Sequence, residues 1–154
     1  MKAQLEIIGA FLLSLSPVAT FAYNVPTVSY QDLFTKSDFV VIATPKSSRD
    51  TSEQMTMKSV NPPVRVIGVT TEFRTLYVLK GSKRSRFKLH HYREPVSKSG
   101  VVIGGPYLVT FSPEENKRYL LFLVRESDGR FAPVWGQQDP AGISVQEISG
   151  TTWD

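Results

Sequence analysis

The stretch VRVIGVTTEFRTLYVLKG, residues 64–81, constrains the fold more than any other part of the sequence. Its alternation predicts a β-strand with Glu72 and Arg74 on one face. The opposite face is predicted to hold Thr71, Phe73, Thr75, Tyr77 and Leu79. Beyond Arg74 the run is apolar on both faces, and a straight strand of this length would reach about 50 Å. We therefore expect the strand to bend at Gly68 and to coil around a small β-barrel.

Other strands are expected where short β-branched and apolar runs lie between turn residues. They are predicted at residues 39–44, 87–92, 101–103, 107–111, 118–124, 131–136 and 145–148. An Asp-Gly pair at residues 128–129 predicts a hairpin turn. Ten prolines and ten glycines favour short strands and turns over long helices. The chain is therefore expected to be mainly β, a mostly antiparallel barrel or sandwich.

Two short helical segments are expected beside the strands. Apolar residues at one-face helical spacing predict a helix over residues 29–36, with Ser29 at its start. The side chains expected to pack it on the body of the protein are Tyr30, Leu33 and Phe34. The sequence SPEENK at residues 112–117 predicts one capped helical turn.

Residues 46–63, KSSRDTSEQMTMKSVNPP, are polar apart from one valine, two methionines and the closing prolines. This composition predicts a long, flexible surface loop. A length of 154 residues suits a single domain, so the loop is expected to belong to that domain.

The first 22 residues have the features of a secretory signal peptide. Lys2 precedes an apolar run over residues 7–15, and Pro17 then breaks any helix. Small residues stand at the two positions that a signal peptidase reads, Thr20 and Ala22. The apolar run is shorter than the roughly 20 residues that span a bilayer. We expect cleavage after Ala22 and a mature domain of residues 23–154 without a transmembrane segment; a buried N-terminal helix is the alternative.

The sequence contains no cysteine. This excludes zinc ribbons, thiol nucleophiles and iron–sulfur clusters. Secreted eukaryotic domains of this size are often stapled by disulfides, so an exported chain without cysteine is more typical of bacteria. We expect an exported bacterial protein, either periplasmic or secreted. No cofactor is expected.

The most basic stretch is KGSKRSRFKLHHYRE, residues 80–94. Its glycine and serines between two predicted strands indicate a solvated turn. Acidic residues of the segment 126–154 could fold against it and neutralise it. The alternative is a polyanion site, in which aromatic residues interleave with cations. The cations expected to carry such a site are Lys83, Arg84, Arg86 and Lys88.

His90 and His91 are the only histidines of the chain. Successive side chains of a strand point to opposite faces, so the two imidazoles are not expected to bind one metal ion. One is expected to face solvent and the other to lie under aromatic rings. No metal site is predicted.

Motifs of catalysis are missing. The sequence has no G-x-S-x-G, no glycine-rich phosphate loop and no H-E-x-x-H. Glu114 and Glu115 are adjacent, but they stand at the predicted helical turn, where acidic residues favour the helix dipole. An enzyme is therefore not expected, and a hydrolase with an unrecognised site is kept as an alternative.

The order of the strands FVVIAT, YVLKG, RYLLFLV and DGRFAPVWG resembles the netrin-module and tissue-inhibitor-like branch of OB-fold domains, in its exported bacterial form. The similarity covers residues 38–136. It implies a small OB-like antiparallel β-barrel with one or two short helices. In the eukaryotic inhibitors an N-terminal cysteine meets the protease zinc and disulfides brace the barrel. This chain has neither, so the resemblance carries over no protease inhibition and no functional residue.

These observations together predict an exported, non-catalytic binding module. Its partner is expected to be a protein or a component of the cell envelope. A polyanion bound by the basic stretch is the first alternative, and hydrolysis is the second. Nucleic acid is disfavoured as the partner because the chain is expected to leave the cytoplasm.

Overall fold

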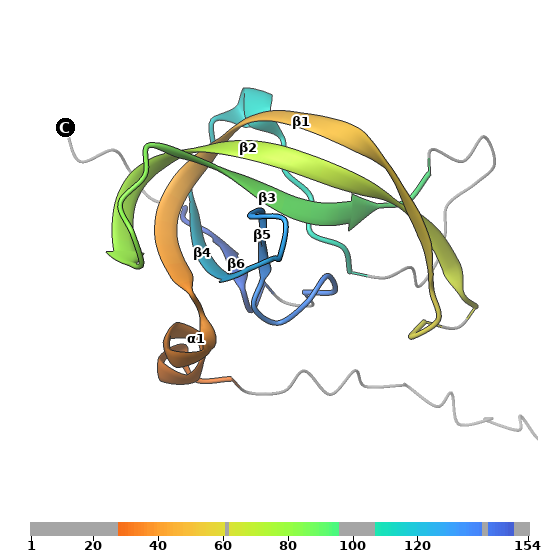
Figure 1. Ribbon diagram of the computed structural model, residues 1–154, viewed down its shortest axis with the longest axis horizontal. Helices are drawn as coiled ribbons and strands as arrows, with labels where there is room; N and C mark the ends of the chain where they lie inside the picture. The colour runs from red at the N-terminus through yellow and green to blue at the C-terminus, as the bar shows by residue number, and fades with distance from the viewer. Residues whose placement is uncertain (1–27, 61, 96–106, 140–141, 150–154) are drawn as a thin grey trace, which may run out of the picture.

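The computed structural model describes residues 28–60, 62–95, 107–139 and 142–149 (Figure 1). The helix α1 (Tyr30–Lys36) comes first, and the 3₁₀ helix η1 (Pro113–Glu115) lies between the third and fourth strands. The strands are β1 (Phe39–Met57), β2 (Val64–Lys80), β3 (Arg86–Arg93), β4 (Tyr119–Arg125), β5 (Phe131–Pro133) and β6 (Val145–Glu147). The prediction of a mainly β chain is confirmed.

The strands form one sheet that curls back on itself (Figure 1). β1 pairs with both β2 and β4, β2 pairs with β3, and β5 joins β3 to β4. These five strands therefore make a ring. The pairings are antiparallel except for β3 with β5, where Leu89 pairs with Phe131 in parallel. β6 pairs with β4 outside the ring.

The main hydrophobic core fills the inside of the ring. Its buried members are Phe39, Val41, Ala43, Phe73, Phe87, Leu89, Tyr119, Leu121, Leu123 and Phe131. Alternate residues of β1, β3 and β4 enter it because side chains alternate across a strand. The rings of Phe73 and Phe87 stack with their centroids 5.3 Å apart. Aromatic pairs of this kind add about 0.5–1.5 kcal/mol to the stability gained by burial alone.

The helix α1 covers the outer face of β1 and β4. Ser29 caps it, since its hydroxyl oxygen accepts a hydrogen bond from the Asp32 amide at 3.0 Å. Leu33 is its buried residue and packs with Val40 and Phe122. Tyr30 and Phe34 remain 61% and 42% exposed, so only one of the three side chains expected to anchor the helix is buried.

The predicted loop at residues 46–63 is wrong as secondary structure, because β1 continues to Met57. Residues 54–57 pair with residues 64–67 of β2, so the two strands extend together as an arm. The pairing shifts between Asp50 and Gln54, opposite Gly68. A Cβ atom on Gly68 would lie 2.5 Å from the Thr51 hydroxyl oxygen, so glycine lets the strands approach there. Met57, Val66 and Tyr92 bury one side of the arm.

The predicted strand at residues 107–111 is reduced to one bridge, between Leu108 and Gln138. The predicted strand at residues 101–103 lies outside the described residues. η1 forms where a helical turn was expected, with Asn116 in the left-handed region at its end. No helix in the described part of the chain has the length and apolarity needed to cross a membrane.

Candidate functional site

The first part of the basic stretch is a connection between two strands, as predicted, and its second part is β3. Lys80 ends β2, Arg86 begins β3, and residues 81–85 join them. Gly81 has φ +94°, and a Cβ atom there would lie 2.8 Å from the Asp38 carbonyl oxygen, so glycine is required at this position. Lys80 is committed to α1, because its ammonium donates to the carbonyl oxygens of Phe34 and Thr35 at 2.7 and 3.1 Å.

The four cations predicted to act together lie in two places. Lys83 and Arg84 line a groove beside the end of β2, whereas Lys88 lines a different hollow on the sheet. Arg86 pairs with Glu72, with 3.0 Å between Nη1 and Oε1. The structure therefore does not bring the four predicted residues into one site.

Arg84 is also a core contact. Its guanidinium carbon lies 5.1 Å from the centre of the Phe39 ring and 4.9 Å from that of Phe131. Its Nε atom is buried and has no hydrogen-bond partner among the described residues. Arg84 is thus held in place by aromatic rings while one of its donors lacks an acceptor.

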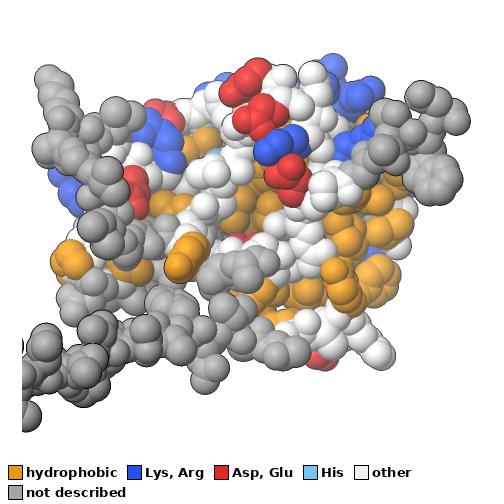
Figure 2. Space-filling view, turned by 180° about the vertical axis from the view of Figure 1, so that it is seen from behind, with side chains coloured by type: hydrophobic (Ala, Val, Ile, Leu, Met, Phe, Trp, Pro, Cys, Tyr) orange, Lys and Arg blue, Asp and Glu red, His pale blue; other side chains and the backbone are white. Residues whose placement is uncertain are grey.

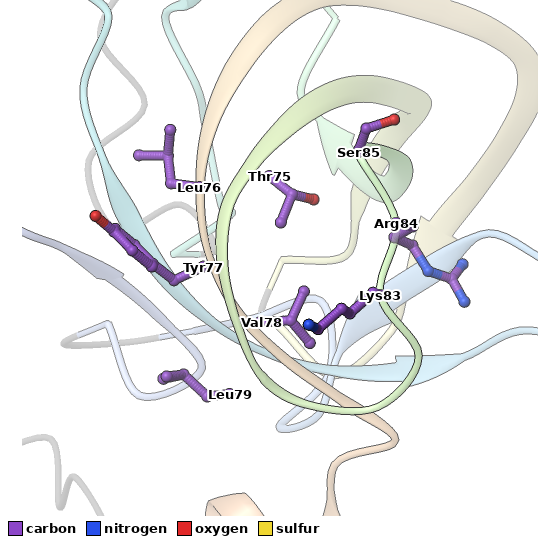
Figure 3. A pocket seen from close by; sticks show the side chains of 8 residues that line it. All are labelled: Thr75, Leu76, Tyr77, Val78, Leu79, Lys83, Arg84 and Ser85. Atoms are coloured by element: carbon purple, nitrogen blue, oxygen red, sulfur yellow. The ribbon is translucent and has the colours of Figure 1, made fainter.

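The groove beside the end of β2 has a volume of about 630 Å³ (Figure 3). We call it the β2 groove; its lining residues are Thr75, Leu76, Tyr77, Val78, Leu79, Lys83, Arg84 and Ser85. Thr75, Val78 and Lys83 point into the space between the strand and the returning connection (Figure 3). The lining contains two cations and no carboxylate, so the β2 groove combines apolar surface with positive charge.

Two irregularities in β2 turn apolar side chains outward beside this groove. The register with β1 shifts so that Leu76 and Leu79 are extra residues with no Cα partner on β1. A bulge of this kind reverses the facing of the residues that follow it. Tyr77 and Leu79 are consequently 68% and 52% exposed, while Val78 packs against the core. The prediction that Tyr77 and Leu79 share the face of Phe73 is wrong for this reason.

We call Leu76, Tyr77 and Leu79 the β2-end patch. All three point to the side of β2 opposite Val78 and Lys83 (Figure 3). Apolar side chains gather at the edge of the molecule where β2 ends, on the right of Figure 2. Ile42 pairs with Tyr77 across the strands, and Phe34 lies under the Lys80 ammonium, 5.2 Å from ring centre to Nζ.

A second basic area lies on the outer face of β1, β2 and β3. Arg74 pairs directly with Arg86, and Arg49 and Lys88 line a hollow of about 140 Å³ with Ser47, Thr70 and Glu72. Neither Arg49 nor Arg74 was predicted as a site residue, although Arg74 was placed on the polar face of its strand. The signal was available for Arg74, which alternates with Glu72 on the polar face of the strand.

None of the described acidic residues beyond position 125 pairs with a lysine or arginine of the basic stretch. Glu126 and Asp128 pair with Arg130, and Glu147 pairs with Lys117. Asp139 accepts hydrogen bonds from the backbone of Ser144 and Val145, and burial raises the pKa of its carboxyl. Among the described residues, the acidic segment meets the charged side chains of the basic stretch through the contact of Glu126 with His90.

The two histidines point to opposite faces, as predicted, but neither faces solvent: each is 4% exposed. His91 lies inside the ring, with its ring centroid 5.2 Å from that of Phe111. His90 lies on the other face, and its Nδ1 is 2.9 Å from Glu126 Oε1. The prediction that one imidazole is solvent-exposed is wrong because side chains of the arm and of the β4–β5 turn cover His90.

His90 sits in a charged cluster that joins three parts of the fold. Its Nε2 lies 3.2 Å from Glu53 Oε2 of β1, without hydrogen-bond geometry. Glu53 also accepts a hydrogen bond from the Tyr92 hydroxyl and lies near Arg130. Burial, followed by the bond to Glu53, raises the pKa of Tyr92. The described residues contain no group of three or more His, Asp or Glu side chains arranged to hold a metal ion.

His91 ends a chain of hydrogen bonds from the surface. Its Nδ1 lies 2.9 Å from the Val109 carbonyl oxygen, which can only accept, so we assign the proton to Nδ1. Nε2 then accepts from the Thr71 hydroxyl at 2.8 Å, and Thr71 accepts from Ser48 at 2.7 Å. Burial lowers the pKa of His91 to about 4. An imidazole of that pKa is a poor general base near neutral pH, so this chain is better suited to stabilising the fold than to activating Ser48.

Comparisons with protein-family models, with curated proteins and with solved structures found no match. The likeness to netrin-module and tissue-inhibitor-like domains stays a prediction. The candidate site is accordingly defined by geometry alone: the β2 groove and the β2-end patch, which share Leu76, Tyr77 and Leu79.

Proposed function

We propose that this chain is a non-catalytic binding module that uses the β2-end patch to contact a partner protein. The observation that carries the proposal is the outward turn of Tyr77 and Leu79, which leaves 68% and 52% of these side chains exposed. Clustered exposed apolar side chains commonly mark interaction sites. Tyrosine is also enriched among the residues that dominate binding energy.

The neighbouring β2 groove supports the same proposal. Its volume of about 630 Å³ falls within the range of ligand pockets, about 300–1,000 Å³. Tyr77, Leu79, Lys83 and Ser85 all line the groove, although the side chains of Tyr77 and Leu79 point to the side of β2 opposite Lys83 (Figure 3). A partner that wraps around the end of β2 would therefore combine apolar contact at the patch with polar contact in the groove.

A selection of random peptides displayed on phage tests this function. The folded chain should enrich a set of peptides, and the variant Tyr77→Ser should lose them because the exposed aromatic ring is removed. Met55→Ser is the matched control, since Met55 is 43% exposed on the arm and should retain the peptides. Failure to enrich any peptide, or equal loss with Tyr77→Ser and Met55→Ser, would count against the proposal.

A second candidate function is binding of a polyanion on the outer face of β1, β2 and β3. The observation that favours it is the direct cross-strand pairing of Arg74 with Arg86, because like charges placed opposite each other destabilise a sheet and only Arg86 has a carboxylate partner among the described residues, Glu72. Binding to heparin should then fall steeply with salt and weaken in Arg74→Ser. Heparin binding that is insensitive to both changes would remove this candidate.

The OB-like barrel and the export of the chain are also proposals. The ring of five strands supports an OB-like barrel, and the features of residues 1–22 support export to the periplasm or beyond. Amino-terminal sequencing of the exported protein should find Tyr23 as the first residue. A first residue at position 1 in the cytoplasmic fraction would contradict export.

A further inference from the structure

We propose that the partner inserts an acidic side chain into the β2 groove, where Lys83 meets its carboxylate. This inference rests on the proposed function, since it names the chemistry of a partner that contacts the end of β2. It follows from charge, from an unmet hydrogen bond and from the anchoring of the connection that carries Lys83.

The charge of the groove is one-sided. Its lining contains Lys83 and Arg84 and no aspartate or glutamate. Lys83 makes no ion pair with any residue that the structure describes, and its side chain lies beside Val78 within the groove (Figure 3). A partner of opposite charge would therefore meet an ammonium group that is not already neutralised.

The nearby carboxylates are committed elsewhere. Glu72 pairs with Arg86 at 3.0 Å. Asp38 accepts a hydrogen bond from the Arg125 amide at 2.8 Å. Neither carboxylate lines the groove, so the positive charge there is left for an external acid.

Two buried polar atoms of the lining also lack partners. Thr75 Oγ1 and Arg84 Nε make no hydrogen bond with any described residue. Both atoms can donate, and a buried donor without an acceptor costs about 1–3 kcal/mol. Thr75 points into the groove on the side of Lys83 (Figure 3), so its hydroxyl is the donor that faces an entering carboxylate, and charge-assisted hydrogen bonds of this kind are stronger than neutral ones.

Arg84 anchors the connection that carries Lys83. Its guanidinium points away from the groove (Figure 3) and rests on Phe39 and Phe131, both nearly fully buried. A connection held in one position loses less freedom on binding than a mobile one. The exposed Lys83 supplies the attraction to the carboxylate, which salt can screen.

The test uses synthetic peptides taken from the display selection, each made with its acidic residues and with glutamines in their place. Acidic peptides should bind the full chain about tenfold more tightly than the glutamine versions. The charge reversal Lys83→Glu should abolish that preference, whereas Lys58→Glu, at the exposed turn between β1 and β2, should preserve it. Isothermal titration at two salt concentrations measures both effects.

The outcomes separate this inference from the proposed function. Peptides that depend on Tyr77 but bind equally well with glutamate or glutamine would overturn the inference and leave the function standing. No selected peptide at all would overturn both. Self-association of the chain that Tyr77→Ser abolishes, measured by analytical ultracentrifugation, would overturn the acidic partner in favour of a second copy.

Discussion

The guanidinium of Arg84 stands 4.9 Å from the centre of the Phe131 ring, which ties the connection between β2 and β3 to the aromatic core. The same guanidinium lies 5.1 Å from the centre of the Phe39 ring. One residue therefore belongs both to the packing of the core and to the lining of the β2 groove.

Truncating Arg84 should destabilise the fold. Arg84→Ala removes the cation from two aromatic rings and the apolar stem that packs with it, so we expect a loss of about 1–2 kcal/mol in the free energy of unfolding. Lys83→Ala should leave that free energy unchanged, because Lys83 is exposed. Urea unfolding measures both variants, and equal stabilities would show that Arg84 contributes no packing.

The packing of helix α1 on the sheet should depend mainly on Leu33. Leu33→Ala creates a cavity next to Val40 and Phe122, so we expect a loss of about 2–4 kcal/mol. Phe34→Ala should cost much less, because Phe34 is 42% exposed. Thermal unfolding of the two variants provides the comparison, and a larger effect at Phe34 would contradict the described packing.

Gly68 should tolerate no side chain. In Gly68→Ala the new Cβ atom would meet the Thr51 hydroxyl oxygen at 2.5 Å and Glu53 Cβ at 3.0 Å. Overpacking of this kind costs about 1–3 kcal/mol. Adding Thr51→Ala should recover part of the loss by removing the nearer atom, and a double-mutant cycle in urea would measure the coupling. Purely additive effects of the two substitutions on the free energy of unfolding would contradict the steric explanation.

His91 should make stability depend on pH. Its pKa falls from 6.5 to about 4 on folding, chiefly through burial, so below pH 6.5 the unfolded chain binds a proton that the folded chain does not. Stability should therefore be complete above pH 6.5 and should decline as the pH falls towards 4, by about 3 kcal/mol at most.

Urea unfolding between pH 7.5 and pH 4 tests this expectation, with His91→Gln as the reference because glutamine does not titrate. The decline across that window should be smaller in the variant. A wild-type stability that stays constant over the same range would show that His91 is protonated equally in both states.

Much of the fold follows from the sequence because its signals are local. Ser29 and the spacing of Leu33 specify α1, and the apolar run at residues 118–124 becomes β4. The Asp-Gly pair places a turn between β4 and β5, with Glu126 and Arg130 bonded through their backbones. Each of these features depends on residues close together in the chain.

The rest depends on how distant strands meet. The polar segment after Pro45 becomes a strand because β2 lies alongside it, and nothing in its own composition indicates this. The bulge at Leu76 reverses the facing of Tyr77, so strict alternation gives the wrong face. The cations of residues 83–88 separate because the chain passes from a connection into a strand between Ser85 and Arg86.

The strand pairings that form the ring differ in length. β3 and β5 meet through one residue pair, Leu89 with Phe131, and side chains supply the remaining connections. His90 bonds to Glu126, and the Gln137 amide donates to the His90 carbonyl oxygen at 3.2 Å. At this joint of the ring, ionisable and amide groups thus add to one main-chain pair, whereas the other joints rely on more main-chain pairs, and a chemical change at His90 would loosen this joint while leaving the remaining strands joined.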